Sequence, residues 1–433
     1  MNIPQSESSL AEWLQWLEEL HPSTIDLGLE RVNSVFGRLA LDLGKSRIVL
    51  VGGTNGKGSS VAMLSGILRA AGHSTGCYTS PHLLVYNERL SLNGRMVDDT
   101  SLCAAFARVE SVRDGVSLTY FEYGTLAALV YFAAGAPDYI ILEVGLGGRL
   151  DAVNIVAPEL SLVTNVALDH LDWLGDTREK IGYEKAGIFR SGKPAIYGES
   201  DIPDSVREAA RQCGAQLFHK GEHYQWQASE QSWQWQGVDA QGRTVTLDQL
   251  PLNDFPLDNA AGVLQALQLL DASIPVEAIR SGLAAAQVPG RFQRLQYQGV
   301  EVILDVAHNP HAATNLAARL GPLAERQPVY LVLAMLGDKD SAAVLRLLAP
   351  LASGLYLAPL AEERGAPVEI IYNHARTAGA EEVACFEDVR AAFAAALTAA
   401  GKSDDDGLHG DPSKGLVVVT GSFFTVASVL ELI

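Results

Sequence analysis

The chain has 433 residues, of which 48% are hydrophobic and 19% are charged, and its formal net charge is -19. The length predicts two or three globular domains, and the apolar content excludes a disordered chain. The acidic balance argues against a general nucleic-acid-binding or membrane-surface protein, so any positive charge for an anionic ligand must be concentrated locally.

The N-terminal part of the chain alternates helical and strand patterns. Residues 10–20 have the apolar spacing of an amphipathic helix, and residues 25–29 run into a second helix that is expected to reach residue 41. Apolar runs at 47–51, 138–144 and 160–166 predict buried strands, with helices expected at 61–69 and 126–136. This alternation predicts an α/β fold with a mostly parallel sheet, in which ligands bind beyond the carboxyl ends of the strands.

The segment Val-Gly-Gly-Thr-Asn-Gly-Lys-Gly-Ser-Ser at 51–60 joins the first of these strands to a helix. Backbone N–H groups at a helix N-terminus and a nearby lysine make a phosphate cradle. The strict pattern G-x-x-x-x-G-K-[ST] does not match, because Gly58 follows Lys57 and Ser59 comes one residue late. A glycine-rich turn alone is usually only a turn. The strand–helix context with Lys57 and Ser59 favours a phosphate site.

Three polar residues fall at or beyond the ends of the following elements. Glu143 ends the second strand, where an acid can hold the Mg²⁺ that bridges nucleotide phosphates, although capping of the strand end is the alternative. His170 follows the third strand, but imidazole is an unusual Mg²⁺ ligand, so by itself it is better interpreted as a satisfied polar residue. Lys185 lies among apolar residues and is either a surface charge or a partly buried amine with altered chemistry.

The alternation of strands and helices is interrupted at about residues 215–250 and restarts beyond residue 292. Tryptophans and glutamines alternate at 224–236, which predicts short antiparallel strands, with a ligand-stacking surface as the less favoured alternative. The segment 288–292 marks a domain boundary, and strands are expected at 301–305, 329–334 and 416–420. Asp305-Val-Ala-His-Asn-Pro310 follows the first of these, in a position that suits ligand binding or helix capping equally. Residues 402–414 are expected to form a solvated loop.

Seven motifs occur in a fixed order along the chain: Gly53–Ser59, Thr79–Leu83 with Asn87–Arg89, Phe121–Thr125, Glu143–Asp151, Ala167–His170, Glu184–Ile188 and Asp305–Pro310. In order and spacing they closely resemble those of the bacterial bifunctional dihydrofolate synthase/folylpolyglutamate synthase family, which is related to the Mur ligases. The match runs from about residue 10 to residue 426, and the glycine after Lys57 is a trait of that family.

The resemblance implies a P-loop-containing, Mur-ligase-like N-terminal domain at residues 1–290, with a mostly parallel sheet that binds ATP and pteroate. It also implies a smaller, Rossmann-like α/β glutamate-ligase domain at 291–433. The implied reaction joins L-glutamate to 7,8-dihydropteroate and to tetrahydrofolate polyglutamates. In that family ATP phosphorylates the acceptor carboxylate, and the amine of glutamate then displaces phosphate. Phosphorylation suits this chemistry because hydroxide is a poor leaving group.

The family's functional positions carry over residue by residue. Catalysis is assigned to Lys57, Lys185 and His170, and Lys185 is expected to be carbamylated. Two Mg²⁺ sites are expected, the first at Ser80 and Glu143 and the second at His170; the loop pattern itself nominates Ser59 instead of Ser80, and this disagreement stays open. ATP is expected between the two domains, on Thr54, Asn55, Gly56, Lys57, Gly58, Ser59, Asn259, Arg291 and Asp305. Pteroate or glutamate is expected on Ile25, Asp26, Leu27, Thr119, Tyr120, Phe121, Glu122, Leu150, Asp151, Ala152 and His308.

Two other functions remain as alternatives. A monofunctional folylpolyglutamate synthase shares most of the motifs, whereas a nucleotide-driven switch or binding protein leaves the motifs at 80–83 and 305–310 unexplained. A Mur-type ligase acting on a nucleotide-sugar peptide would normally need an additional N-terminal domain.

The expected partners are therefore small molecules, with no nucleic acid and no membrane, and a monomer is expected. Four separated cysteines, the absence of a signal-peptide pattern and an apolar maximum of only 126–136 predict a cytoplasmic location.

Overall fold

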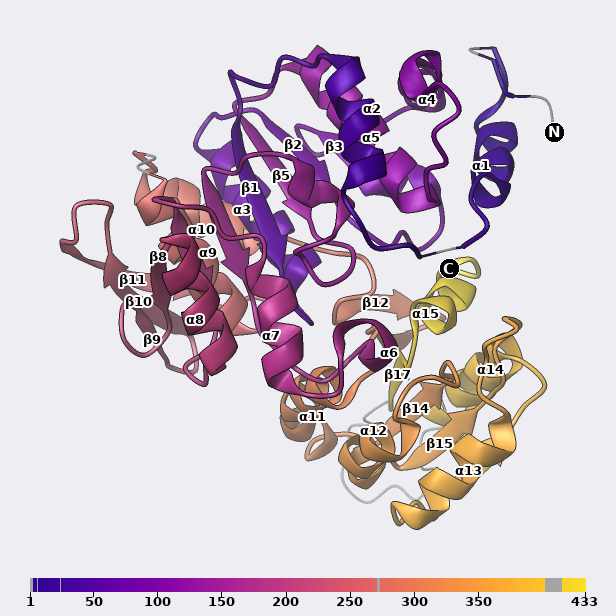
Figure 1. Ribbon diagram of the computed structural model, residues 1–433. Helices are drawn as coiled ribbons and strands as arrows, with labels where there is room; N and C mark the ends of the chain where they lie inside the picture. The colour runs from indigo at the N-terminus through magenta and orange to yellow at the C-terminus, as the bar shows by residue number, and fades with distance from the viewer. Residues whose placement is uncertain (1–2, 6, 24, 271–272, 402–414) are drawn as a thin grey trace. The chain divides into compact units, whose positions relative to one another are not determined.

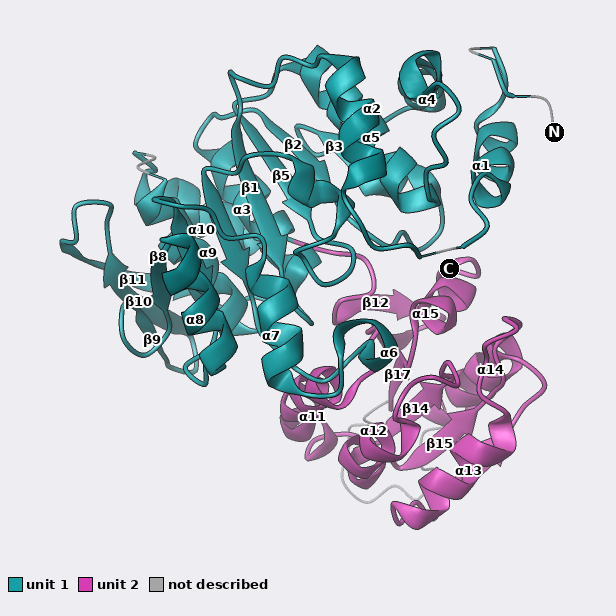
Figure 2. Ribbon diagram, viewed as in Figure 1, with its two compact units in different colours: residues 1–286 teal, residues 287–433 magenta. Residues whose placement is uncertain are grey.

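The computed structural model describes residues 3–5, 7–23, 25–270, 273–401 and 415–433 (Figure 1). The loop expected at 402–414 lies outside the described residues. The chain divides into two compact units, residues 1–286 and 287–433, which Figure 2 colours separately. Within the described ranges, no helix combines the length and the apolar character that crossing a membrane would require.

Unit 1 is built on an eight-stranded sheet in the order β4-β3-β2-β5-β1-β6-β7-β8. The six strands from β2 to β8 in this order run parallel, whereas at the other edge β3 pairs antiparallel with β2 and β4 pairs antiparallel with β3. The strands are β1 (Arg47–Gly52), β2 (Thr75–Tyr78), β3 (Leu90–Leu92), β4 (Arg95–Met96), β5 (Tyr139–Glu143), β6 (Leu160–Val163), β7 (Pro194–Tyr197) and β8 (Gln216–His219).

The register of the central strands decides where functional residues meet. β1 lies between β5 and β6, with Val51 opposite Glu143 and Gly52 opposite Val163. The three strands therefore end at one level, and the segments that follow them gather at one edge of the sheet. This arrangement confirms the mostly parallel sheet expected from the alternating pattern.

Helices cover both faces of this sheet because its central strands are apolar on both sides. Alternate residues such as Ile48 and Leu50 pack into a core shared with α1, α2, α4 and α5, and α3 packs with α9 and α10. The helices are α1 (Leu10–Glu19), α2 (Glu30–Leu39), α3 (Lys57–Ala70), α4 (Asp99–Arg113), α5 (Tyr120–Gly135), α6 (Leu171–Leu174), α7 (Arg178–Ala186), α8 (Asp204–Cys213), α9 (Leu257–Leu269) and α10 (Val276–Ala285), with 3-10 turns η1 (Tyr86–Arg89) and η2 (Ala152–Ile155).

Two helix boundaries differ from the sequence-based expectation. α2 begins at Glu30 and ends at Leu39, and Ala40 has a left-handed backbone, so residues 25–29 and 41 lie outside the helix. α5 begins at Tyr120 instead of 126, because Thr119 and Glu122 form a reciprocal capping box that starts the helix earlier.

The tryptophan-rich segment forms the expected antiparallel strands, β9 (Gln225–Ala228), β10 (Ser232–Val238) and β11 (Thr244–Pro251). Trp233 and Trp235 are 2% and 0% exposed, and their indole N–H groups donate to the carbonyls of Pro251 and Ala261. Both rings therefore serve packing, as the favoured interpretation predicted.

Unit 2 contains a six-stranded sheet in the order β12-β13-β17-β14-β15-β16, parallel except for β12. Its strands are β12 (Gln293–Tyr297), β13 (Val300–Leu304), β14 (Val329–Leu333), β15 (Gly354–Leu357), β16 (Val383–Cys385) and β17 (Leu416–Thr420). Its helices are α11 (Pro310–Ala324), α12 (Ser341–Leu348), α13 (Val368–Thr377), α14 (Val389–Gly401) and α15 (Phe423–Leu430), with the 3-10 turn η3 (Ala349–Leu351). This is the smaller α/β unit expected in the C-terminal part of the chain.

Candidate active site

The glycine-rich loop between β1 and α3 has a backbone that only glycine allows. Gly53 and Gly56 have φ angles of +138° and +83°, and a Cβ on Gly53 would lie 1.8 Å from Oγ1 of Thr164. Asn165 holds the loop from the end of β6, because its carbonyl and side-chain oxygens accept the N–H groups of Thr54 and Asn55, each at 3.0 Å. The loop therefore has a fixed shape at the N-terminus of α3, where backbone N–H groups attract anions.

Two lysines converge on this loop. Nζ of Lys57 lies 3.1 Å and Nζ of Lys185 lies 3.0 Å from the carbonyl oxygen of Gly53. Lys185 is buried, and burial together with the charge of Lys57 lowers the pKa of Lys185 to about 7. Two cationic groups at one carbonyl favour an anion beside them, and a lysine with this pKa is partly a neutral nucleophile at physiological pH.

Glu143 lies beside the start of α3. Its Oε2 accepts the N–H of Ser80 at 3.2 Å, and a Cβ on Gly58 would lie 3.6 Å from the same oxygen. A side chain at Gly58, the residue that broke the strict motif, would thus be in van der Waals contact with this carboxylate. Carboxylate and hydroxyl oxygens are donors that suit Mg²⁺, and Glu143 supplies the carboxylate here. The choice between Ser59 and Ser80 as the metal ligand stays a prediction.

The Ser80 segment is held in shape by Glu88, a residue that the sequence analysis did not assign. Its carboxylate accepts the N–H groups of Leu83, Leu84 and Val85 at 2.7, 2.7 and 2.9 Å. Three donors on one carboxylate fix the turn that follows Ser80, so Glu88 is a positioning residue. Glu88 was visible in the sequence only as part of the Asn87–Arg89 motif, because an isolated acid gives no sign of three backbone partners.

Asp151 and His170 occupy contrasting environments near the two lysines. Asp151 is buried and accepts N–H groups from Leu146 and Val153, and burial raises the pKa of its carboxyl to about 6 against the opposing charge of Lys57. His170 is exposed, with a left-handed backbone at the start of α6. The negative charge of Asp169, the residue before His170, partly offsets the lowering of the pKa of Lys185.

The predicted pteroate-binding segments meet through Arg31, which the sequence analysis also did not assign. One guanidinium nitrogen lies 2.6 Å from Asp26 and the other lies 3.1 Å from Glu122. Among the described residues, Nε of Arg31 is a buried donor without a hydrogen-bond partner. The second oxygen of Glu122 accepts the N–H of Thr119 at 2.8 Å, so Glu122 also caps α5. An arginine on an amphipathic helix looks like a surface charge in the sequence, which explains why it was missed.

The aromatic part of the same region is anchored by Phe121. Its ring stacks on Tyr78, with centroids 5.8 Å apart and an interplanar angle of 29°. A Cβ on Gly145 would lie 2.7 Å from the ring, so glycine is needed there for Phe121 to approach. The loop that carries Leu150, Asp151 and Ala152 is thereby connected to the residues at the start of α5.

The predicted nucleotide residues lie in two clusters, one in each unit. In unit 1, a Cβ on Gly56 would lie 2.3 Å from Nδ2 of Asn259, so Asn259 on α9 packs against the glycine-rich loop.

In unit 2, Asp305 follows β13 and accepts N–H groups from Phe292 and Ala307, each at 2.9 Å. The sequence analysis did not assign Phe423. The centre of its ring lies 4.9 Å from Cζ of Arg291 and 6.2 Å from the centre of the His308 ring. Burial raises the pKa of the Asp305 carboxyl, and the positive charge of Arg291 partly offsets this.

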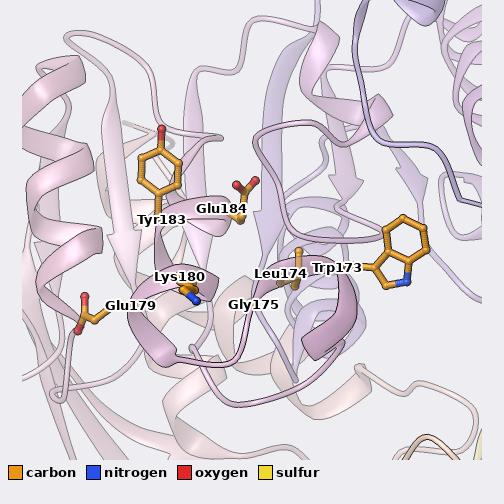
Figure 3. Close-up of a pocket in the computed structure, with 7 residues that line it drawn as sticks. All are labelled: Trp173, Leu174, Gly175, Glu179, Lys180, Tyr183 and Glu184. Carbon is orange, nitrogen blue, oxygen red and sulfur yellow. The ribbon is translucent and has the colours of Figure 1, made fainter.

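A pocket of about 510 Å³ lies between α6 and α7. Figure 3 shows its labelled lining side chains, which come from α6, the following turn and α7. Its charged groups have protein partners: Glu184 pairs with Arg149 at 2.9 Å and Lys180 with Asp176 at 2.8 Å. The surface that the pocket presents to a ligand is therefore mainly the aromatic rings of Trp173 and Tyr183. These two residues lie close in sequence to His170 and Lys185.

Comparisons with known proteins agree with this geometry. The Mur ligase middle domain matches residues 51–248, and the Mur ligase glutamate ligase domain matches residues 290–423. The dihydrofolate synthase/folylpolyglutamate synthase of Escherichia coli strain K12 is 45% identical over 430 residues, which cover 99% of this chain and 97% of that protein.

Two solved structures extend the similarity to the whole fold. E. coli FolC in complex with DHPP and ADP has a TM-score of 0.91 and 44% identity, with 99% of each chain covered. A bifunctional folylpolyglutamate synthase/dihydrofolate synthase with Mn, AMPPNP and L-glutamate bound has a TM-score of 0.88 and 44% identity, covering 100% of this chain and 99% of that one. The resemblance drawn from the sequence motifs is confirmed, and this chain belongs to the Mur ligase family, among its dihydrofolate synthase/folylpolyglutamate synthases.

Proposed function

We propose that this chain is an ATP-dependent ligase that joins L-glutamate to 7,8-dihydropteroate, giving dihydrofolate, and to tetrahydrofolate polyglutamates. The observation that carries the proposal is the convergence of Lys57 and Lys185 on the Gly53 carbonyl at the N-terminus of α3. Glu143 lies beside the same helix start. These groups suit a phosphoryl transfer between two anions, which would otherwise repel each other.

The reaction proceeds in two steps. A carboxylate oxygen of the acceptor attacks the γ-phosphorus of ATP, the bond to the bridging oxygen breaks, and ADP leaves. The nitrogen of glutamate then attacks the carbonyl carbon of the acyl phosphate, inorganic phosphate leaves, and the amine loses a proton to solvent. Lys57 and the loop N–H groups hold the transferred phosphoryl group. Mg²⁺, when bound by Glu143 and Ser80, supplies further neutralisation of the phosphate charge.

We assign Lys185 a carbamate formed with carbon dioxide. The neutral amine attacks carbon dioxide and loses a proton, which gives an anionic oxygen donor in place of an ammonium group. A pKa of about 7 leaves much of the amine neutral at physiological pH, and the adjacent charge of Lys57 favours the anionic product. The carbamate and His170 would hold a second Mg²⁺, for which an oxygen donor is the better ligand.

The substrate positions follow from the contacts of each unit. The loop residues 54–59 and Asn259 are proposed nucleotide contacts in unit 1, and Arg291 and Asp305 are those in unit 2. Residues 25–27, 119–122 and 150–152 are proposed pteroate contacts. The Nε of Arg31, which has no hydrogen-bond partner in the described part of the chain, supports a polar substrate group near them. His308 is proposed to lie near the phosphate or the glutamate.

The decisive experiment measures phosphate release by the purified protein with ATP and Mg²⁺. Glutamate-dependent release with 7,8-dihydropteroate and with tetrahydrofolate is expected. Release with tetrahydrofolate alone would establish a monofunctional folylpolyglutamate synthase, and ATP turnover that ignores glutamate would favour a nucleotide-driven switch. Lys57→Ala should abolish most of the release, while Lys45→Ala, an exposed lysine of the same unit, should not.

We further propose that the protein acts as a monomer in the cytoplasm. Its four cysteines, Cys77, Cys103, Cys213 and Cys385, are free thiols, as expected in a reducing compartment. Light scattering coupled to size exclusion should give the mass of one chain, and a doubled mass would contradict the monomer.

A further inference from the structure

A cluster of imidazole and carboxylate groups lies at the end of β8, on elements that the ligase chemistry does not use. His219 is the last residue of β8, and Glu222 and His223 follow in the next turn. One potential ligand atom from each of the three residues lies within 4.8 Å of the other two. The cluster is therefore a candidate metal site separate from the phosphate loop.

The backbone of the turn brings these three side chains together. The carbonyl of His219 accepts the N–H groups of Glu222 and His223 at 3.4 and 3.0 Å, and Gly221 has a φ angle of +88° that permits the turn. The two imidazole rings lie 5.3 Å apart with an interplanar angle of 69°. A five-residue segment thus presents all three groups without help from distant parts of the chain.

The hydrogen bonds of His219 orient it as a ligand. Its Nδ1 lies 3.0 Å from the carbonyl oxygen of Lys220, so Nδ1 carries a proton and donates it to that oxygen. In neutral His219 the lone pair is then on Nε2, which lies 2.7 Å from Oε2 of Glu222. This lone pair can accept a hydrogen bond from the guanidinium of Arg207 or bind a metal ion, and the Glu222 carboxylate supplies negative charge beside it. A carbonyl that holds the Nδ1 proton is also the usual outer partner of a metal-binding histidine.

We propose that His219, Glu222 and His223 bind one divalent first-row transition-metal ion of the Zn²⁺ type, with His219 ligating through Nε2. Two imidazoles and a carboxylate suit Zn²⁺, Cu²⁺ or Ni²⁺, whereas Mg²⁺ prefers oxygen donors. Glu222 and His223 have side-chain exposures of 62% and 28%, so they can rotate to close around the ion. His223 gives up only a 3.3 Å hydrogen bond, which its Nδ1 accepts from the N–H of His219.

Arg207 on α8 competes with the metal for the same atom. Its Nη1 lies 3.1 Å from Nε2 of His219, and its positive charge opposes a second cation there. Metal binding therefore requires this guanidinium to move away. It follows that Arg207→Gln should bind the metal more tightly than the wild type.

Titration of tag-free protein with Zn²⁺, with a chromophoric chelator as competitor and excess Mg²⁺ present, tests the proposal. One Zn²⁺ per chain is expected, with affinity reduced more than about tenfold in His223→Ala and Glu222→Gln and increased in Arg207→Gln. His73→Ala, a histidine of another turn in the same unit, serves as the control and should bind Zn²⁺ like the wild type.

Anomalous diffraction at the zinc edge should place the ion about 2.1 Å from Nε2 of His219. Equal affinity in the wild type and His223→Ala, or a zinc peak only elsewhere in the molecule, would overturn the proposal. Because these experiments measure zinc binding directly, a result that overturns the metal site would not bear on the proposed ligase activity.

Discussion

Gly56→Ala is predicted to destabilise unit 1 more than an alanine at another glycine with the same backbone conformation. Gly56 has a φ angle of +83°, and its Cβ would lie 2.3 Å from Nδ2 of Asn259. Gly72, just beyond the end of α3, has a φ angle of +91°, and nothing lies within 4 Å of its Cβ position. The two sites therefore share the conformational penalty and differ only in the steric one.

The expected magnitudes follow from this difference. An alanine in the left-handed region costs about 1–2 kcal/mol at either site. Crowding against the buried Asn259 adds about 1–3 kcal/mol at Gly56 alone. Gly56→Ala should therefore lower the free energy of unfolding by about 1–3 kcal/mol more than Gly72→Ala does.

Urea unfolding followed by tryptophan fluorescence measures this quantity in the right part of the molecule. All six tryptophans lie in unit 1, so the signal reports that unit: Trp13, Trp16, Trp173, Trp226, Trp233 and Trp235. In the Gly56→Ala background, the second substitution Asn259→Ala removes the clash. It should therefore restore about 0.5–3 kcal/mol of the free energy of unfolding, relative to the sum of the two single effects. Equal losses for Gly56→Ala and Gly72→Ala, or no coupling with Asn259, would refute the steric reasoning.

Three further predictions concern the proposed ligase site. Because the pKa of Lys185 is about 7, its neutral fraction rises from about 10% at pH 6 to about 90% at pH 8. At constant dissolved ¹³C-labelled carbon dioxide, the carbamate NMR signal should rise with pH in the wild type and be absent in Lys185→Arg; a signal that falls with pH would contradict this assignment. Arg31→Met removes the three hydrogen bonds that the guanidinium donates to Asp26 and Glu122, and it should raise the KM for dihydropteroate about 10–100-fold, while Arg38→Met on the same helix should not; equal effects would rule out a specific role. Glu88→Gln should raise the Mg²⁺ concentration for half-maximal activity about tenfold by loosening the turn after Ser80, and an unchanged value would exclude this positioning role.

The elements of the fold could be predicted because their signals are local. Apolar runs predicted the strands β1, β5 and β6, and the sequence pattern around Lys57 predicted the glycine-rich loop and the helix α3 that follows it. The first and last residues of a helix were less predictable where a capping side chain outside the apolar run decides them. The capping box of Thr119 and Glu122 starts α5 six residues before the apolar run, and residues 25–29 stay outside α2.

The sequence by itself determined the chemistry that the chain carries. Its ordered motifs identify the family, and residue types such as Lys57 and Glu143 already indicate phosphate and metal binding. What the tertiary structure decided are the partnerships between residues far apart in the chain. Lys185 meets Lys57 at one carbonyl, Arg31 joins Asp26 to Glu122, and Asn259 packs on Gly56. These contacts follow from strand register and helix packing, which bring distant segments together and change the pKa of a lysine that looks ordinary in the sequence.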